Sequence, residues 1–312
     1  MLDRRRFLTL AVAGLSQAQE KITRPAVSQD ACPLEPIAPL ARDGHRGQGF
    51  LRQPPGAGPF PAILSIHGGL VTRPAQELQD YALNGPNPSR FLAAGYVLVV
   101  ITYRSRDHDP QSTVSLEDCL AAVDHLRRLP FVDSKSIVVY GCSGGGDLAL
   151  EIAAATEVCA IAPEEPASVL LTGIFNTKFP KQGERYTPAD AGPISQDPKR
   201  YYLPEYQKLT RAKIARIRCP ILIVQGDRHP INRFNADVLI PELRAAKKML
   251  EVITYAGEPH CFGFYGSGPR TPRPAAALKV FSDTDAFYRR YLPTKPKPID
   301  PRLVKHVPLP DQ

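Results

Sequence analysis

The stretch that most constrains this chain covers residues 138–147, where an apolar run breaks into glycines around one serine. An Ala/Leu-rich segment follows, so the pattern predicts a buried strand, a sharp turn and a helix. Gly141 and Gly145 complete G-x-S-x-G around Ser143, because Cβ atoms would collide in so tight a turn. The turn would lift the hydroxyl above the sheet, and the following amides, Gly144 first, would face whatever it attacks. A glycine-rich turn that merely contains a serine fits these residues equally well, so the remaining sequence must decide.

The composition predicts one globular domain over residues 19–312 of the 312-residue chain. Its 43% hydrophobic content is enough for one large core, and no linker divides it. No apolar run reaches membrane-spanning length, which predicts the absence of a membrane span. The histidines lack ligand spacing and there is no C-x-x-C, so we expect neither a metal nor another cofactor. The positive charge follows no nucleic-acid reading module, so nucleic acid is not an expected partner. The oligomeric state is left open.

The N-terminal residues 1–18 have the composition of an export signal. Three arginines precede Phe7 and a short apolar stretch, and small residues occupy positions 16 and 18. The pattern resembles a twin-arginine signal, with Asp3 where Ser or Thr is preferred. We therefore expect a periplasmic or secreted protein, the alternative being a frayed basic terminus. The six cysteines could pair in 15 ways in an oxidising compartment or remain buried free thiols.

Strand-like and helix-like segments alternate along the chain. Apolar runs predict strands at residues 49–52, 62–66, 96–103, 136–140, 158–162, 221–224 and 250–255, and helices at 115–130, 144–155, 235–248 and 275–291. Ser115 and Asp118 have the spacing of a capping box at the start of one helix. This alternation predicts an α/β fold with a mainly parallel, doubly wound sheet and helices on both faces.

Residues 176–218 lose this periodicity and carry ten Lys or Arg against four Asp or Glu, a net charge of +6. Long irregular insertions in compact domains are usually functional, so this segment is interpreted as a lid over the active site. A solvated basic face is the alternative. The Pro-rich tail at 292–312 is expected to be extended.

Chemically useful residues follow the ends of several strands, where ligands gather in such sheets. They are His67-Gly68-Gly69, Ser143, Asp227 and His260. With these motifs, residues 47–291 resemble the α/β-hydrolase family, in its esterase and prolyl-oligopeptidase-like (dienelactone-hydrolase-like) branch. The resemblance implies that Ser143 is the nucleophile and His260, in Gly-Glu-Pro-His, its base. Chemistry agrees, because a serine hydroxyl needs a base that titrates near neutral pH. The backbone N–H of Gly144, with that of Gly68 or Gly69, would form the oxyanion hole.

The acid of the triad is less well defined by the sequence. The family usually carries it three residues after the glycine at 226, and here that position is His229, which cannot supply an anion. Asp227 is the nearest candidate and the one we expect. Glu164 or Glu165, just past the end of the preceding strand, are alternatives, as in lipases whose acid lies one strand earlier.

The expected function is hydrolysis of carboxylic esters through a serine acyl-enzyme, as in a carboxylesterase or acetyl-esterase. A prolyl-oligopeptidase-type peptidase is the second candidate, because the peptide-cleaving relatives carry a large propeller for which the sequence before His67 is too short. A non-catalytic binding protein of the same fold is a third. The basic, tyrosine-rich lid favours a small-molecule or carbohydrate-linked ester with anionic or sugar-like character, such as an acylated polysaccharide.

Overall fold

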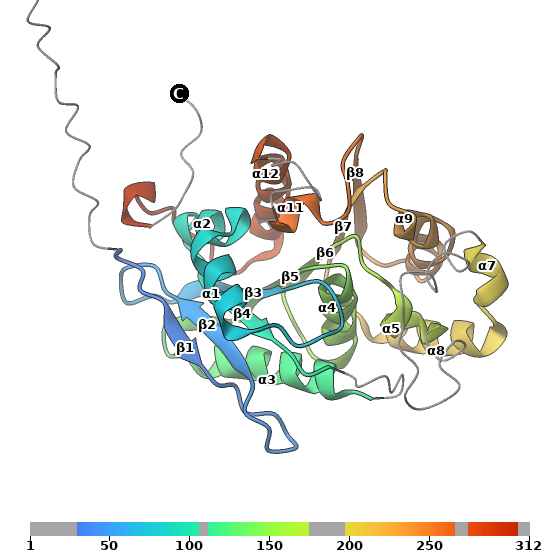
Figure 1. Cartoon of the computed structure of the whole chain (residues 1–312), viewed down its shortest axis with the longest axis horizontal. Coiled ribbons are helices and arrows are strands. Elements are labelled where there is room, and N and C mark those ends of the chain that lie inside the picture. The colour runs from blue at the N-terminus through green and yellow to red at the C-terminus, as the bar shows by residue number, and fades with distance from the viewer. Residues whose placement is uncertain (1–29, 106–111, 175–196, 266–273, 305–312) are drawn as a thin grey trace, which may run out of the picture.

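The computed structural model describes residues 30–105, 112–174, 197–265 and 274–304 (Figure 1). The expected export signal at 1–18 and residues 176–196 of the expected lid lie outside these ranges. Within them the chain forms an eight-stranded sheet in the order β1-β2-β4-β3-β5-β6-β7-β8. The strands are β1 Glu35–Ile37, β2 Gln48–Arg52, β3 Phe60–Ile66, β4 Val97–Thr102, β5 Val132–Cys142, β6 Ala160–Glu164, β7 Ile221–Gly226 and β8 Leu250–Tyr255.

The sheet is mainly parallel, as expected. β1 and β2 pair antiparallel, and β2 joins β4 antiparallel, whereas the pairs from β4 through β3, β5, β6 and β7 to β8 are parallel. Strands β3, β4 and β7 are buried on both faces over nearly their whole length, which is why their sequences are continuous apolar runs and not alternating ones. All six parallel strands therefore end at the same edge of the sheet.

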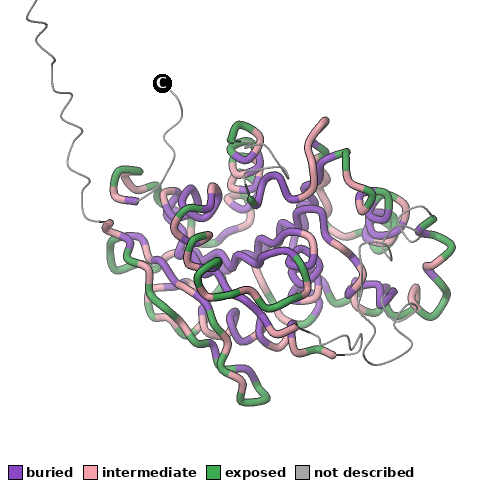
Figure 2. Tube along the Cα trace, in the orientation of Figure 1, coloured by how far each residue is buried: buried purple, intermediate pink, exposed green. Residues whose placement is uncertain are grey.

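Helices cover both faces of this sheet (Figure 1). They are α1 Ala75–Asn84, α2 Pro86–Ala93, α3 Val114–Arg128, α4 Gly144–Ala155, α5 Val169–Thr172, α7 Pro198–Tyr201, α8 Pro204–Arg216, α9 Ile231–Phe234, η2 Asn235–Leu239, α10 Ile240–Ala245, α11 Phe262–Tyr265, α12 Pro274–Tyr291 and η3 Pro301–Leu303. One core cluster lies between the sheet and α3, α4, α8 and α10, and a second between the sheet and α1, α2, α11 and α12. Figure 2 shows the centre of the sheet as continuously buried, whereas the edge strands β1 and β8 consist mainly of partly buried or exposed residues. Among the described helices, none is both long and apolar enough to cross a membrane.

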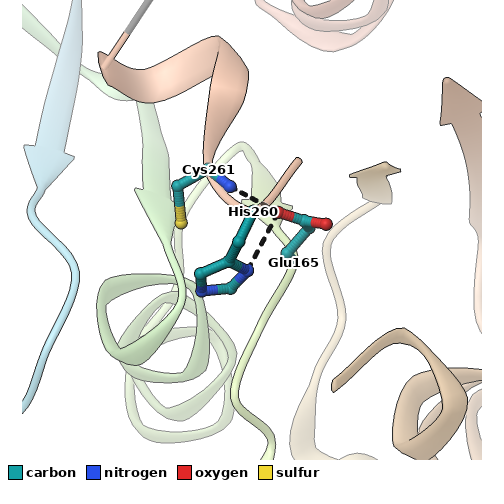
Figure 3. A group of neighbouring side chains, drawn as sticks. All are labelled: Glu165, His260 and Cys261. Atoms are coloured by element: carbon teal, nitrogen blue, oxygen red, sulfur yellow. Dashed lines mark hydrogen bonds and ion pairs between the residues drawn. The ribbon is translucent and has the colours of Figure 1, made fainter. Parts of the chain in front are cut away.

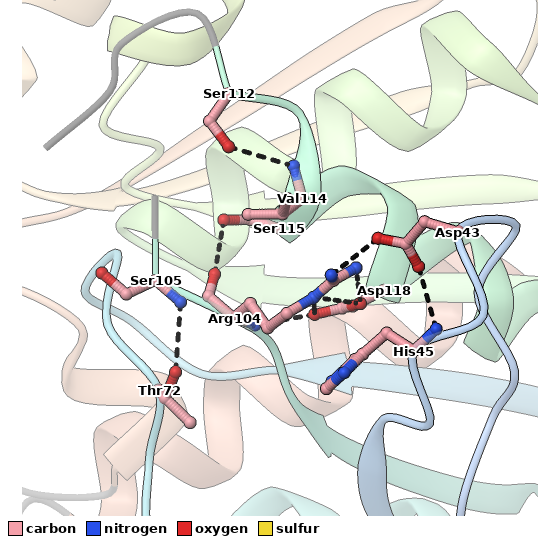
Figure 4. A network of polar contacts seen from close by, with 9 residues as sticks. All are labelled: Asp43, His45, Thr72, Arg104, Ser105, Ser112, Val114, Ser115 and Asp118. Atoms are coloured by element: carbon pink, nitrogen blue, oxygen red, sulfur yellow. Dashed lines mark hydrogen bonds and ion pairs between the residues drawn. The ribbon is translucent and has the colours of Figure 1, made fainter. Parts of the chain in front are cut away.

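The capping box expected at the start of α3 is wrong. Thr113 occupies the N-cap and its side chain makes no capping bond, while the Ser115 hydroxyl donates to the backbone oxygen of Arg104 at 2.8 Å. Asp118 accepts from the Arg104 backbone N–H at 2.7 Å and from its guanidinium, which also reaches Asp43 (Figure 4). Ser115 and Asp118 therefore connect α3 to Arg104, just after β4. Asp118 binds the guanidinium and not a helix N–H because hydrogen bonds to a charged donor are stronger.

Part of the expected lid belongs to the helical layer. Residues 204–216 form α8, whose Ile214 joins the larger core cluster. Lys213 reaches across to α4 and α5, donating to Glu151 at 2.7 Å and to the Leu170 backbone oxygen at 2.8 Å. The helix was missed because only Thr210 and Ile214 are buried along it, so its apolar stripe is too narrow to register in the sequence.

The start of the tail also packs against the domain. Ile299 donates its backbone N–H to the Ala93 oxygen at 2.9 Å, and Val304 is buried beside Leu92 and Cys32. All six cysteines lie among the described residues and are free thiols, so the structure realises the unpaired alternative.

Candidate active site

Ser143 stands at the turn between β5 and α4 with a φ of 51°, in the left-handed region that non-glycine residues rarely adopt. Glycine is required on both sides. A Cβ on Gly141 would lie 2.4 Å from the Gly145 oxygen, and one on Gly145 would lie 2.3 Å from the oxygen of Ile66, at the end of β3. The G-x-S-x-G spacing therefore reflects close backbone approach, and the expected nucleophile elbow is present.

The loop after β3 is fixed by the residues around it. The His67 ring nitrogens lie 2.9 Å from the Gly68 oxygen and 3.2 Å from the Thr102 hydroxyl, and the ring stacks on Tyr103 at 4.5 Å. The Tyr103 hydroxyl donates to the backbone oxygens of His67 and Gly69. Burial lowers the pKa of His67 to about 4, so the ring is neutral at pH 7. His67 thus shapes the loop.

The expected oxyanion donors lie close to the serine but differ in availability. A Cβ placed on Gly68 would come within 3.3 Å of the Ser143 Cβ, so this loop and the elbow are in contact. The Gly68 N–H donates to the Tyr265 hydroxyl at 3.2 Å. Gly144 begins α4, where a backbone N–H has no partner within its own helix. Gly144 is therefore the better placed of these donors, and Tyr265 is a neighbour that the sequence did not indicate.

His260 faces Glu165, not Asp227. The Nδ1 atom of His260 lies 3.0 Å from Glu165 Oε2, at an ion-pair distance but without linear hydrogen-bond geometry (Figure 3). Glu165 is completely buried, whereas a quarter of the His260 side chain is exposed. The elbow is tied to the same turn, because the Ser143 N–H donates to the Glu164 oxygen at 2.9 Å and its own oxygen accepts from Ala167 at 3.0 Å.

Several donors converge on the Glu165 carboxylate. The backbone N–H of Gly226 and the Asn232 amide donate to Oε1 at 3.1 and 3.0 Å, and the Cys261 N–H donates to Oε2. Burial alone would raise the pKa of Glu165, but the contact with His260 and these donors hold the pKa below its usual range. The carboxylate is therefore charged at neutral pH. It can orient the imidazole and stabilise the imidazolium that forms when the ring accepts a proton.

The expectation that Asp227 is the acid needs correction. Asp227 is exposed and its carboxylate accepts from the Gly257 N–H at 2.8 Å, so it secures the start of the histidine loop. His229, at the usual position of the acid, stacks on His260 with ring centroids 4.1 Å apart. Burial, followed by the charge of His260, lowers the pKa of His229 to about 4. A neutral ring therefore covers one face of the catalytic candidate.

Strained backbone marks this site. Ser143, Glu165 and Cys261 have φ values of 51°, 44° and 56°, all in the left-handed region. The cost is roughly 1–3 kcal/mol each, and it persists only where the surrounding contacts dictate the conformation. Two of these residues are triad candidates and the third follows His260 directly.

Glu165, His260 and Cys261 could also supply metal ligands, since their ligand atoms lie within 4.8 Å of one another. Burial raises the pKa of the Cys261 thiol well above its usual value, which disfavours the thiolate that a metal needs. Cys142 and Cys261, the residues next to Ser143 and His260, are buried in the same core cluster. The contact between Glu165 and His260 is accounted for without a metal.

A turn-borne serine, an oxyanion loop and a histidine with a buried carboxylate lie together at one sheet edge, and the family comparison agrees with them. The Prolyl oligopeptidase family matches residues 89–294 of the 312. The chain belongs to the prolyl oligopeptidase family. The fold is that of the α/β-hydrolases, and the protein is a serine hydrolase. No curated protein sequence gives a significant match.

Solved structures with the same fold include esterases and a peptidase. An esterase from Pyrobaculum calidifontis is 20% identical, with a TM-score of 0.59 over 83% of this chain and 85% of that one. Carboxyl esterase 2 from Tuber melanosporum is 18% identical, with a TM-score of 0.61 over 87% and 95%. A puromycin-hydrolyzing peptidase from Mycobacterium tuberculosis is 19% identical, with a TM-score of 0.61 over 86% of this chain but 41% of that one.

Proposed function

We propose that this family member hydrolyses carboxylic esters, with Ser143 as nucleophile, His260 as general base and Glu165 as the acid behind it. The approach of the buried Glu165 carboxylate to His260 Nδ1, at 3.0 Å, is the observation that carries the proposal. The Glu165 carboxylate holds a proton on His260 Nδ1, so that Nε2 is the nitrogen free to accept the proton of Ser143. That proton then leaves with the alcohol, and water repeats the sequence to release the acid.

The Gly144 N–H would stabilise the oxyanion of each tetrahedral intermediate, and the backbone N–H of Gly68 or Gly69 would be the second donor. A single such donor contributes about 3–4 kcal/mol in other hydrolases. The N-terminal position of Gly144 in α4 adds the positive end of that helix.

Ester hydrolysis is the first candidate because both esterases described above share the fold of this chain over most of their own length. The chain spans most of the length of the two esterases described above but only 41% of the puromycin-hydrolyzing peptidase. Peptide cleavage is the second candidate, supported by the family itself. We also propose export to the periplasm or cell exterior, on the strength of residues 1–18 alone.

The proposal is tested with p-nitrophenyl esters of increasing acyl length beside aminoacyl anilides, using wild type and Ser143→Ala. We expect ester turnover that requires Ser143, with acetyl or other short acyl groups preferred. A fluorophosphonate probe should label wild type and not the variant. Hydrolysis of the anilides without hydrolysis of the esters would favour a peptidase. Absence of labelling would favour a non-catalytic binding protein of this fold.

The preference for an anionic or sugar-like substrate has a separate test. Lys199 and Arg200 are exposed on α7, in the part of the basic, expected lid that the structure describes. Changing both to Gln should raise KM for an acylated acidic polysaccharide and leave that for p-nitrophenyl acetate unchanged. Equal kinetics on both substrates would remove these side chains from substrate recognition.

A further inference from the structure

Glu164 is a fully buried carboxyl group directly before the proposed acid, and the mechanism above does not use it. The two consecutive glutamates bind successive parts of the same turn. Glu165 accepts from the Cys261 N–H, and Glu164 Oε1 accepts from the Gly263 N–H at 2.7 Å. The start of α11 and the residue before it, which follow His260, are thus held by two consecutive carboxyl groups.

A closed network surrounds the Glu164 carboxyl. Tyr140, on β5, donates its hydroxyl to Oε2. The Asn87 amide nitrogen, on α2, donates to the Tyr140 oxygen at 3.2 Å and to the Gly263 oxygen at 2.8 Å. Both polar groups of the Gly263 backbone are therefore fixed by buried side chains, the N–H by Glu164 on β6 and the oxygen by Asn87 on α2. A Cβ on Gly263 would lie 3.0 Å from both Glu164 carboxyl oxygens and 2.7 Å from a Val280 methyl, so the fit leaves no free space.

His260 needs such support, because it lies in a turn outside any helix or strand. Its ring is oriented by Glu165 and by the stack on His229, but these contacts act on the side chain. The backbone position of the ring depends on the residues that follow. A misplacement of about 1 Å at a catalytic group can cost roughly a hundredfold in rate.

We propose that Glu164 is a positioning residue for the general base, fixing the backbone of residues 261–264 so that His260 is held between Ser143 and Glu165. The inference rests on the proposed function. Burial raises the pKa of Glu164 to about 8, while that of Glu165 is held below its usual range. At neutral pH the two neighbours therefore do different work: Glu165 carries the charge that faces the imidazole, and Glu164 holds the turn.

Two variants test this independently. Glu164→Gln keeps the shape of the side chain but directs an NH₂ group at donors, and Tyr140→Phe removes one hydroxyl while keeping the ring that stacks on Phe264. We expect kcat for p-nitrophenyl butyrate to fall about tenfold to a hundredfold in the first and less in the second, with KM within about twofold. The rate of fluorophosphonate labelling of Ser143 should fall in the same order.

Matched controls separate positioning from stability. Asp118→Asn removes another buried carboxylate, bound to Arg104, and Tyr288→Phe removes another buried hydroxyl, bound to the Val139 oxygen. Each should lower the melting temperature and leave kcat within about twofold. If Glu164→Gln and Tyr140→Phe behave like these controls, or leave kcat unchanged, the inference is wrong. An inactive, unlabelled wild type would instead overturn the proposed function.

Discussion

Replacing Glu165 by Gln tests the reassigned acid most directly. The substitution keeps the size of the side chain but removes the charge that lies 3.0 Å from His260 Nδ1. It also sets an amide against donors from Gly226, Asn232 and Cys261. The base would then lose its preferred tautomer and the stabilisation of its protonated form.

The size of the effect follows from that distance. Unit charges 3.0 Å apart interact by about 5.5 kcal/mol at an effective dielectric constant of about 20. With about 1.36 kcal/mol for each factor of ten in rate, this sets an upper end near 10⁴-fold in kcat. Loss of the acid from another serine triad costs a similar factor.

The assay is steady-state hydrolysis of p-nitrophenyl butyrate, with circular dichroism to establish that the variant is folded. Asp227→Asn is the matched control. Its carboxylate is exposed and, among the described residues, accepts from the Gly257 N–H at the start of the histidine loop, so kcat should stay within about threefold. A folded Glu165→Gln protein with more than a tenth of wild-type activity, or an equal loss in Asp227→Asn, would refute the assignment.

Three further outcomes follow from the site. His229→Ala should lower kcat for ester hydrolysis about threefold to tenfold, because it removes the ring stacked on His260. His229→Phe keeps an aromatic ring there, so its kcat should stay near that of wild type. Gly145→Ala should cost at least about 1–3 kcal/mol in urea unfolding, because its Cβ would overlap the Ile66 oxygen. The free energy of unfolding should fall as the pH rises from about 4.5 to 8, by at most about 1.4 kcal/mol per pH unit. The raised pKa of Glu164 stabilises the native state at low pH, and this stabilisation is lost as the pH rises through 8. The slope of unfolding free energy against pH should flatten in Glu164→Gln.

The positions of Ser143 and His260 at one edge of the sheet could be predicted because their signals are local. Glycines around Ser143 and an apolar run before each motif are properties of neighbouring residues, and parallel strands bring their ends to one edge. The acid depends on distant contacts. Glu165 turns toward the histidine only with its N–H bonded to the Val224 oxygen and its φ at 44°, and neither condition is visible in its neighbours.

Asp227 misled for a related reason. A Cβ on Gly226 would lie 2.2 Å from the Glu258 oxygen, so the end of β7 passes directly against the histidine loop. That approach leaves Asp227 beside Gly257, where it binds a backbone N–H. The sequence correctly places Asp227 just after β7, but the direction of its side chain is set by the packing of two loops that are thirty residues apart.

The left-handed residues at the active site bear on how this enzyme would respond to selection. Glycine at 143, 165 or 261 would relieve roughly 1–2 kcal/mol of backbone strain at each position. A screen for heat resistance alone would therefore reward loss of the proposed nucleophile, whereas glycine at 165 would also leave the buried donors of Gly226, Asn232 and Cys261 without their acceptor. Thermostable variants of this hydrolase should be sought in the helical layer around α8, away from the strained edge, with turnover measured in every round.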